Sequence, residues 1–277
     1  MQIKVDYHFH PNFPLFIPFF GEYLANKKAK AIWKAFTEKS LDAVLITEHA
    51  YKNPKTSFEI LEKNKPKNAK TLIIPGVEAL TKEGTDIIVF AKNKKEIYCH
   101  KSLMTPWKLK TLELVKLVKK HPSLYGIVVH PYTPGTTGIV HNNGIEVTRK
   151  AIKELGFVEL YNCSFTALIR LFNILGLNKI LKKKHSQMIN TANAPEALRN
   201  KNTIITGGSD AHHVKEIGDY IGIDANNKKN IFDIITERSG KITRIEKSIS
   251  ALISNAFTVS REWLMKNLHL YTIDKPI

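Results

Sequence analysis

The stretch Ile3-Lys4-Val5-Asp6-Tyr7-His8-Phe9-His10 joins a short β-branched run to two histidines. Isoleucine and valine favour an extended backbone, so the run predicts a strand from Gln2 to Asp6. His8 and His10 lie two residues apart at its end, and side chains with that spacing share one face of a strand. Both imidazoles can therefore reach a common point.

Four other motifs place polar side chains directly after an apolar run. They are Thr47-Glu48-His49, Pro75-Gly76-Val77-Glu78, Val128-Val129-His130-Pro131 and Gly208-Ser209-Asp210-Ala211-His212. If the runs are parallel strands, their carboxyl ends lie on one face of the fold and the side chains converge there. Imidazoles and carboxylates gathered in this way are the ligands of a site for several metal ions.

Strand-like and helix-like segments alternate over most of the chain. Strands are predicted at residues 2–6, 43–47, 71–77, 86–91, 125–129, 157–161, 203–206 and 220–223, and helices at 22–40, 58–65, 107–120, 144–155, 165–184 and 231–238. This alternation predicts an α/β fold with a parallel sheet, and seven or so strands favour a closed barrel. Residues 82–85 are expected to form a hairpin turn, Pro106 to open a helix and Gly156 to cap one.

The composition indicates one globular domain. The 277 residues are 43% apolar and can bury a sizeable core. We expect residues 1–277 to form a single barrel domain, with the motifs within 1–240 and a C-terminal helical extension at 241–277. No apolar stretch reaches the roughly 20 residues that span a bilayer, and the N-terminus lacks the features of a signal peptide. Two cysteines are too few for a disulfide framework, so a cytoplasmic location away from membranes is expected.

The chain is strongly basic, with a net charge of +17. Its lysines gather at residues 27–30, 92–95, 116–120 and 179–184. An excess of positive charge attracts polyanions and steers phosphorylated substrates. The alternative is that each run is a solvated helix face or loop. A phosphate-bearing ligand is expected in preference to a cationic one.

The candidate ligands differ in what each side chain can do. Of Glu48 and His49, only one is expected to face the interior, because neighbouring strand residues point to opposite faces. We favour His49 as the ligand, with Glu48 as its orienting partner or an alternate ligand. Glu78 can bridge two ions, which a neutral imidazole cannot do. The proline that follows His130 should hold that residue in an extended conformation.

The last motif repeats the spacing of the first. Asp210 and His212 are two residues apart, and Gly207-Gly208 is expected to give a flexible approach to them. Asp6 is either a partner that orients an imidazole or a solvated strand residue. His213 is expected to face away from the site. Surface or structural roles are expected for His100, His121, His141, His185 and His269.

Together the motifs resemble the PHP (polymerase and histidinol phosphatase) domain phosphoesterases. The resemblance covers roughly residues 1–240, with the motifs in the family's order, and Glu159-Leu160-Tyr161-Asn162 is similar to a strand often seen before the last motif. It implies a distorted (β/α)7 barrel that holds two or three divalent ions. By position, one ion would be held by His8, His10, Glu78 and Asp210, a second by Glu78 and His130, and a third by His49 and His212.

Two departures from the family's pattern bear on the site. Many members have an acidic or histidine ligand soon after the first motif, where this chain has Pro11-Asn12-Phe13-Pro14-Leu15-Phe16. That difference weakens the case for the third ion. Many members also have a histidine near the strand after the third motif, where this chain has Asp86 at the strand's start and His100 beyond it. We expect Asp86 to be the substitute ligand.

The resemblance implies metal-dependent hydrolysis of a phosphoester, in which a hydroxide held between two cations attacks phosphorus. His212 or His49 would protonate the leaving oxygen if the third ion is absent. A distal phosphate would bind Lys52, Arg149 or a lysine within 92–95. Histidine-rich ligation suits zinc, manganese or iron.

A small phosphomonoester or nucleotide-like phosphate is the expected substrate. One alternative is a nuclease acting on DNA or RNA, which the positive charge supports. Another is a non-catalytic metal-binding module, against which the presence of Glu78, Asp210 and both histidines of the first motif argues. Nothing in the sequence indicates an oligomeric state.

Overall fold

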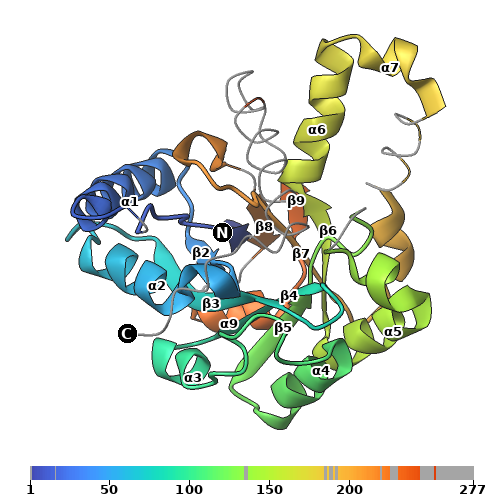
Figure 1. Ribbon diagram of the computed structural model, residues 1–277, viewed down its shortest axis with the longest axis horizontal. Helices are drawn as coiled ribbons and strands as arrows, with labels where there is room; N and C mark the ends of the chain where they lie inside the picture. The colour runs from blue at the N-terminus through green and yellow to red at the C-terminus, as the bar shows by residue number, and fades with distance from the viewer. Residues whose placement is uncertain are drawn as a thin grey trace.

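A single sheet at the centre of the molecule curls round into a barrel (Figure 1). The structure is a computed structural model that describes residues 2–15, 17–133, 137–183, 186, 190, 193–218, 220–224, 230–243 and 253, with the backbone alone at 163–168, 220, 242 and 243. Within these ranges the strands are β1 (Gln2–Phe9), β2 (Ala43–Ile46), β3 (Leu72–Leu80), β4 (Asp86–Ala91), β5 (Leu124–Val128), β6 (Phe157–Asn162), β7 (Ile204–Gly208), β8 (Tyr220–Asp224) and β9 (Lys241–Thr243).

Helices connect the strands and cover the outside of the sheet. The α-helices are α1 (Gly21–Glu38), α2 (Pro54–Lys63), α3 (Lys94–Tyr98), α4 (Thr111–Lys120), α5 (Ile139–Leu155), α6 (Cys163–Ile174), α7 (Leu177–Ile180) and α9 (Ile231–Glu237). Short 3-10 helices are η1 (Ala50–Lys52), η2 (Ala194–Leu198) and η3 (Val214–Glu216). None of the helices in the described ranges has the length and apolar character that a membrane span requires.

The strand order is β7-β6-β5-β4-β3-β2-β1-β8-β9. Strands β1, β2 and β3 run parallel to one another, as do β5, β6 and β7, whereas β4 is antiparallel to both of its neighbours and β8 is antiparallel to β1. The β3–β4 pair is the hairpin that the sequence predicts around residues 82–85. The expected distorted α/β barrel is confirmed, and the two antiparallel strands are its distortion.

The barrel closes at β1, whose first half pairs with β8 and whose end bonds to the segment after β7. Residues from Gln2 to Val5 pair with β8. Beyond them, the carbonyl of His8 accepts from the N–H of Asp210 at 2.7 Å, and the N–H of His10 donates to the carbonyl of Ala211 at 3.0 Å. The end of β1 is thereby joined to the segment that leaves β7, and we call this junction the seam.

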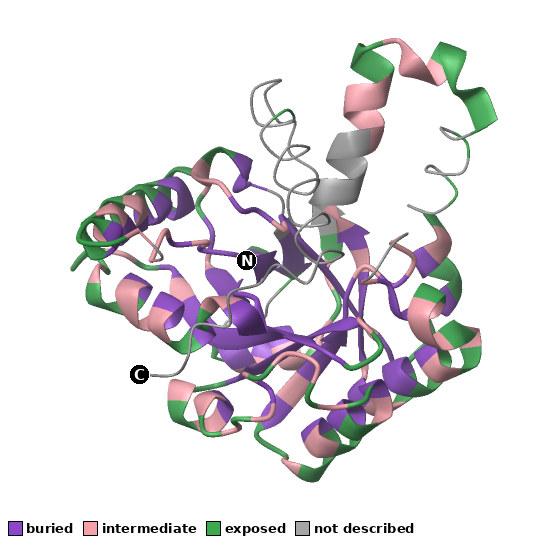
Figure 2. Cartoon of the chain, viewed as in Figure 1, coloured by how far each residue is buried: buried purple, intermediate pink, exposed green. Residues whose placement is uncertain are grey.

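Apolar side chains fill the barrel and the space beneath the helices. One cluster takes residues from every strand from β1 to β8 and from α9, among them Val5, Leu45, Phe90 and Phe232. Since all these strands contribute to it, this cluster fills the barrel interior. Two further clusters lie between the sheet and the outer helices, and Figure 2 shows the buried strands enclosed by helices with exposed outer faces.

A bulge in β1 turns two consecutive side chains inward. The register of β1 on β2 shifts between Asp6 and Phe9, a distortion that re-aims side chains at barrel rims. The hydroxyl of Tyr7 reaches the carbonyl of Ile235 in α9 at 3.0 Å, and the His8 ring also faces the interior. Regular alternation would have sent one of these two side chains outward.

Several predicted boundaries are wrong. Strands β1 and β3 continue to Phe9 and Leu80, so His8 and Glu78 lie within strands rather than after them. The helix expected from residue 107 begins at Thr111, because Trp107 has a φ of 57° and its N–H donates to the carbonyl of Leu80.

Three other predicted helices also differ from those observed. The helix expected at 58–65 begins earlier, at Pro54, and the one at 144–155 begins at Ile139 with a break at Gly144. The helix expected at 165–184 is divided into α6 and α7 at Gly176, which has a φ of 68°. Of the expected extension at 241–277, the first residues form β9, and apart from residue 253 the remainder lies outside the described residues.

Candidate metal centre

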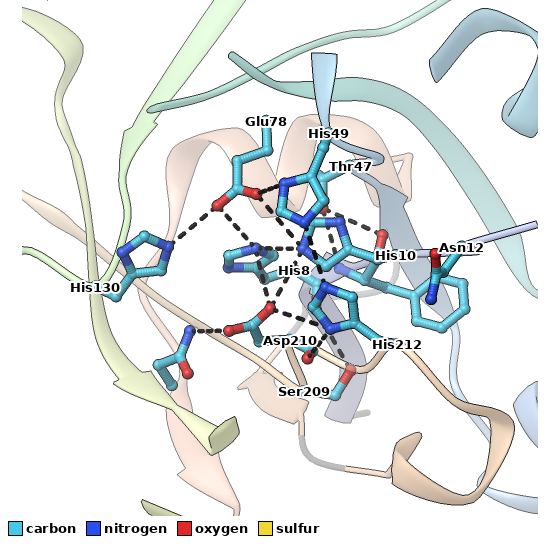
Figure 3. A network of polar contacts seen from close by, with 12 residues as sticks. His8, His10, Asn12, Thr47, His49, Glu78, His130, Ser209, Asp210 and His212 are labelled. Atoms are coloured by element: carbon cyan, nitrogen blue, oxygen red, sulfur yellow. Dashed lines mark hydrogen bonds and ion pairs between the residues drawn. The ribbon is translucent and has the colours of Figure 1, made fainter. Parts of the chain in front are cut away.

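Seven of the nine predicted ligands converge where the barrel strands end (Figure 3). Within the described residues, three overlapping groups have ligand atoms within 4.8 Å of one another: His8 with His10 and Asp210, His8 with Glu78 and His130, and His10 with His49 and His212. These side chains come from β1, β3 and the segments that follow β2, β5 and β7. They also come from all five motifs.

The first group stands at the seam. The Nε2 atoms of His8 and His10 are 3.0 Å apart, and Asp210 Oδ1 lies 3.6 Å from the first and 3.3 Å from the second. The Nδ1 atom of His8 is 3.0 Å from Glu159 Oε1, and a carboxylate oxygen can only accept, so Nδ1 donates its hydrogen there. The Nε2 atom of His8 is then available to a metal ion.

Glu78 lies between the other ligands, and each of its two carboxylate oxygens is close to two histidines. Its Oε1 is 3.1 Å from His130 Nε2 and 3.5 Å from His8 Nε2. Its Oε2 is 3.7 Å from His10 Nε2 and forms a close ion pair with His49 Nδ1. This placement is the one that a carboxylate bridging two ions requires.

The third group consists of imidazoles alone. The Nε2 atoms of His49 and His212 are 3.3 Å apart, and the His10 ring stacks on both, with centroids at 4.2 and 4.4 Å. His212 Nδ1 lies 3.1 Å from the carbonyl of Asp210, to which it donates. Its Nε2 therefore lies beside that of His49, where the two imidazoles could hold one ion.

The electrostatics of the centre favour bound positive charge. Burial by itself lowers the pKa of the His8 imidazole, yet Asp210, Glu159 and Glu78 raise that pKa well above its usual value. Burial raises the pKa of Glu78, but His49, His130 and His8 hold it well below the usual range. Buried carboxylates that stay ionised beside imidazoles match the donor set of a divalent cation, so the residues fit the metal ions that the resemblance implies.

His130 is not extended, contrary to expectation. Its φ is 27°, a positive value that is rare outside glycine. Its N–H donates to Glu159 Oε2 at 2.7 Å, and this bond stabilises the strained backbone. Asp210 and Asn12 also have positive φ, at 45° and 46°, and strain of this kind is concentrated at functional sites.

Glu48 and Asp86 lie outside the three groups. Burial raises the pKa of Glu48, but His10 and Lys52 bring it down to about 2, and the carboxylate accepts from the N–H of Asn12 at 2.5 Å and from that of His49 at 3.2 Å. Glu48 thus holds the backbone beside the ligands. Asp86 is buried in β4 and raises the pKa of His130 from a distance.

Among the described residues, Asp6 and the other histidines also lie outside the three groups. Asp6 orients no imidazole; it accepts from the N–H and hydroxyl of Ser209 and from the N–H of His8. His213 lies at the start of η3, and its N–H donates to Glu216. The rings of His100 and His121 contact each other edge to face, with centroids 4.5 Å apart, and His141 is exposed. His185 and His269 lie outside the described residues.

Among the expected phosphate-binding cations, one contacts a side chain that lies beside the centre. Lys52 Nζ donates to Asn12 Oδ1 at 3.2 Å. Arg149 is paired with Glu146 on the exposed face of α5, and Lys94 is paired with Glu62.

Glu159 and Lys28 are functional residues that sequence reasoning missed. Glu159 had a signal, because it follows an apolar run on β6 within a motif quoted above. Lys28 had none, since it resembles the other lysines of α1. Its Nζ donates to the carbonyls of Asn12 and His212 at 2.9 and 3.0 Å. Burial and Lys52 lower its pKa to about 8, against the opposing effect of Glu48.

The comparisons with known proteins agree with the fold. No protein-family model matches the chain, and no curated protein does. PsfC from Pseudomonas syringae PB-5123 is similar in structure, with a TM-score of 0.61 and 16% identity over 95% of this chain and 99% of PsfC.

A second similar structure is the lesion-specific endonuclease PfuEndoQ from Pyrococcus furiosus, with a TM-score of 0.54 and 14% identity over 87% of this chain and 58% of that one. Endonuclease Q in complex with a 27-mer duplex bearing an abasic lesion gives 0.50 and 13%, over 85% and 55%. This chain thus spans little more than half of the endonuclease. Identities this low show a shared fold and no more.

Proposed function

We propose that this protein is a PHP-type phosphoesterase that hydrolyses a small phosphomonoester or nucleotide-like phosphate with two or three divalent ions. The observation that supports the proposal is the convergence of seven buried or half-buried ligands from five strand ends into three overlapping groups. Divalent ions in such a centre supply a water nucleophile at neutral pH and offset the charge that develops on phosphate oxygens.

The chain's own residues hold the ligands and move the protons. His8, His10, Glu78 and Asp210 would bind one ion, with Glu78 and His130 at a second position and His49 and His212, beside the His10 ring, at a third. Glu159 keeps the His8 hydrogen on Nδ1, so that Nε2 faces the centre. When the third position is empty, His49 or His212 can pass a proton to the leaving oxygen.

Metal content and ester hydrolysis test the proposal together. We would measure bound transition metal by mass spectrometry, and turnover of p-nitrophenyl phosphate and bis-p-nitrophenyl phosphate, for the wild type, His8→Ala and the exposed control His141→Ala. Two or more ions per chain are expected in the wild type and the control, with monoester turnover lost in His8→Ala. A wild-type chain that binds no transition metal and hydrolyses neither ester contradicts the proposal.

A nuclease is the second candidate. The net charge of +17 and the fold shared with an endonuclease support it. A nuclease should hydrolyse the diester in preference to the monoester. It should also cleave DNA or RNA with an affinity that falls steeply with salt.

A further inference from the structure

Lys28 reaches from α1 to the two backbone segments that carry ligands at the seam. One segment follows β1 and contains His10 and Asn12, and the other follows β7 and contains His212. Lys28 Nζ donates to the carbonyls of Asn12 and His212 at 2.9 and 3.0 Å. These segments are far apart in the sequence, and a single ammonium group holds a carbonyl of each.

Two buried carboxylates hold the N–H groups of the same segments. Glu48 accepts from the N–H of Asn12 at 2.5 Å, and Glu216 accepts from the N–H groups of His212 and His213 at 2.8 and 2.9 Å. Both glutamates are fully buried. The ammonium of Lys28 therefore completes a set of charged partners that holds each segment at its donor and at its acceptor.

We propose that Lys28 is the positioning residue of the third cation position, formed by His49 and His212 beside the His10 ring. Lys28 binds the carbonyl of His212 itself and that of Asn12, which lies two residues after His10. His49 follows Glu48, the carboxylate that holds the N–H of Asn12. The inference rests on the proposed function, because it concerns how the same centre keeps its third ion.

The other two positions depend on different contacts. His8 and His130 are held by Glu159. Asp210 and His10 are held at the seam, through the N–H bond of Asp210 to the carbonyl of His8 and that of His10 to the carbonyl of Ala211. Glu78 lies within β3. Loss of the Lys28 ammonium should therefore loosen the third position and leave the first two in place.

The test uses Lys28→Met, which keeps much of the side chain's length but cannot donate. Titration with Co²⁺ and with Zn²⁺, followed by native mass spectrometry and by the visible absorption of Co²⁺, reports each ion without any turnover. Three ions are expected in the wild type. In Lys28→Met the affinity for the last ion should fall about 10- to 100-fold, as expected when a group that orients ligands is removed.

Two further variants separate positioning from general stability. Lys28→Arg should recover most of the affinity for the third ion, since a guanidinium can donate to both carbonyls. Lys27→Met removes the adjacent, exposed lysine of α1 and should bind three ions as the wild type does. If Lys28→Met does not fold, Lys28→Leu takes its place; it likewise cannot donate and should lose the third ion in the same way.

The possible outcomes are distinct. A Lys28→Met or Lys28→Leu chain that binds the third ion with wild-type affinity overturns the inference, as does a wild type that binds only two ions; both leave the proposed function standing. A wild type that binds no ion contradicts the proposed function itself. Selective loss of the third ion, with recovery in Lys28→Arg, supports the role of Lys28.

Discussion

Glu159 acts on two ligands at once without belonging to any of the three groups. One oxygen accepts from the His8 ring, and the other accepts from the N–H of His130 at 2.7 Å and from the side chain of Asn162 at 3.2 Å. The first contact fixes a tautomer, and the second fixes a strained backbone. A single carboxylate therefore determines how two imidazoles face the centre.

Replacement of Glu159 by Gln should weaken metal binding about 10- to 100-fold. Glutamine keeps the size of the side chain but has only one oxygen, so it cannot accept from both His8 and His130. Competition with a chelating dye measures the affinity. Glu146→Gln, on the exposed face of α5, is the matched control. Equal affinities in the two variants would contradict the role given to Glu159.

Asp6 predicts a pH dependence of stability. Burial raises its pKa from 3.8 to about 7, although Ser209 and His8 act in the opposite direction. An acid whose pKa rises on folding binds its proton more tightly in the native state. The stability it contributes is therefore complete below about pH 4 and is lost as the pH rises through about 7, by at most about 1.4 kcal/mol per pH unit.

Asp6→Asn removes this titration. The amide oxygen can still accept from both N–H groups, and the Ser209 hydroxyl can accept from the amide. Urea unfolding with chelator present should show the variant gaining stability relative to the wild type from pH 5 to pH 7, with a constant difference above pH 7. Parallel stability curves for the two proteins over this range would refute the assignment to Asp6.

At the level of elements, close packing of β7 on β1 explains the glycines of the last motif. A Cβ on Gly208 would lie 2.3 Å from the Cβ of His8 and 2.6 Å from its nitrogen. The sequence suggested that Gly207-Gly208 supplies flexibility. The structure shows instead that Gly208 allows two strands to approach closely at the seam.

Gly208→Ala should destabilise the fold by roughly 1–3 kcal/mol, the usual effect of overpacking, and should also lower the bound metal, because it displaces His8. Urea unfolding and metal content measure the two effects. Gly156→Ala is the control. That glycine caps α5 with a φ of 79° and open space around it, so alanine there should cost about 1–2 kcal/mol and leave the metal content unchanged. Full metal content in Gly208→Ala would show that the seam tolerates the methyl group.

The sequence was sufficient to predict the order of the elements. It was not sufficient to predict where they end or which side chains point into the barrel. Apolar runs and glycine caps marked most strands and the end of α5. The bulge that turns both Tyr7 and His8 inward depends on how β1 pairs with β2, which no local pattern records. Trp107 looked helical because of Pro106, yet a bond to Leu80 on β3 decides its backbone.

The candidate site was likewise predicted only in part. Residues whose chemistry is evident from their type and position after a strand were found, and these are the ones brought together. Residues that hold the ligands were not: Lys28 and Glu159 bind partners far away in the sequence, so their roles appear only when the chain is folded. Glu48 was chosen by the same local rule, which cannot tell a ligand from its neighbour, and Asp86 was chosen only as the substitute for a histidine of the family's pattern.

For the whole molecule, the metal centre is a link between strands. Its candidate ligands come from β1, β3 and the segments after β1, β2, β5 and β7, so each bound ion would tie together parts of the barrel that are otherwise held by packing and by sheet hydrogen bonds. Binding energy at the centre is therefore also folding energy.

Removal of metal should lower the thermal stability. An ion that binds the native state alone contributes about 2.7 kcal/mol when its free concentration is 100 times its Kd, which for a chain of this size corresponds to a Tm higher by several degrees. Differential scanning calorimetry with and without chelator measures the change. His8→Ala should respond much less to the chelator, and an identical response in both proteins would argue against binding at this centre.

The seam also sets when the candidate metal centre can first be complete during synthesis. Asp6 and Ser209, which join across it, are separated by 203 residues, so His8 and His10 leave the ribosome long before Asp210 exists. Until β7 and the segment after it are made, these histidines lack Asp210, the carboxylate that meets them across the seam. Binding of the first ion by all four of its proposed ligands would therefore follow translation of β7.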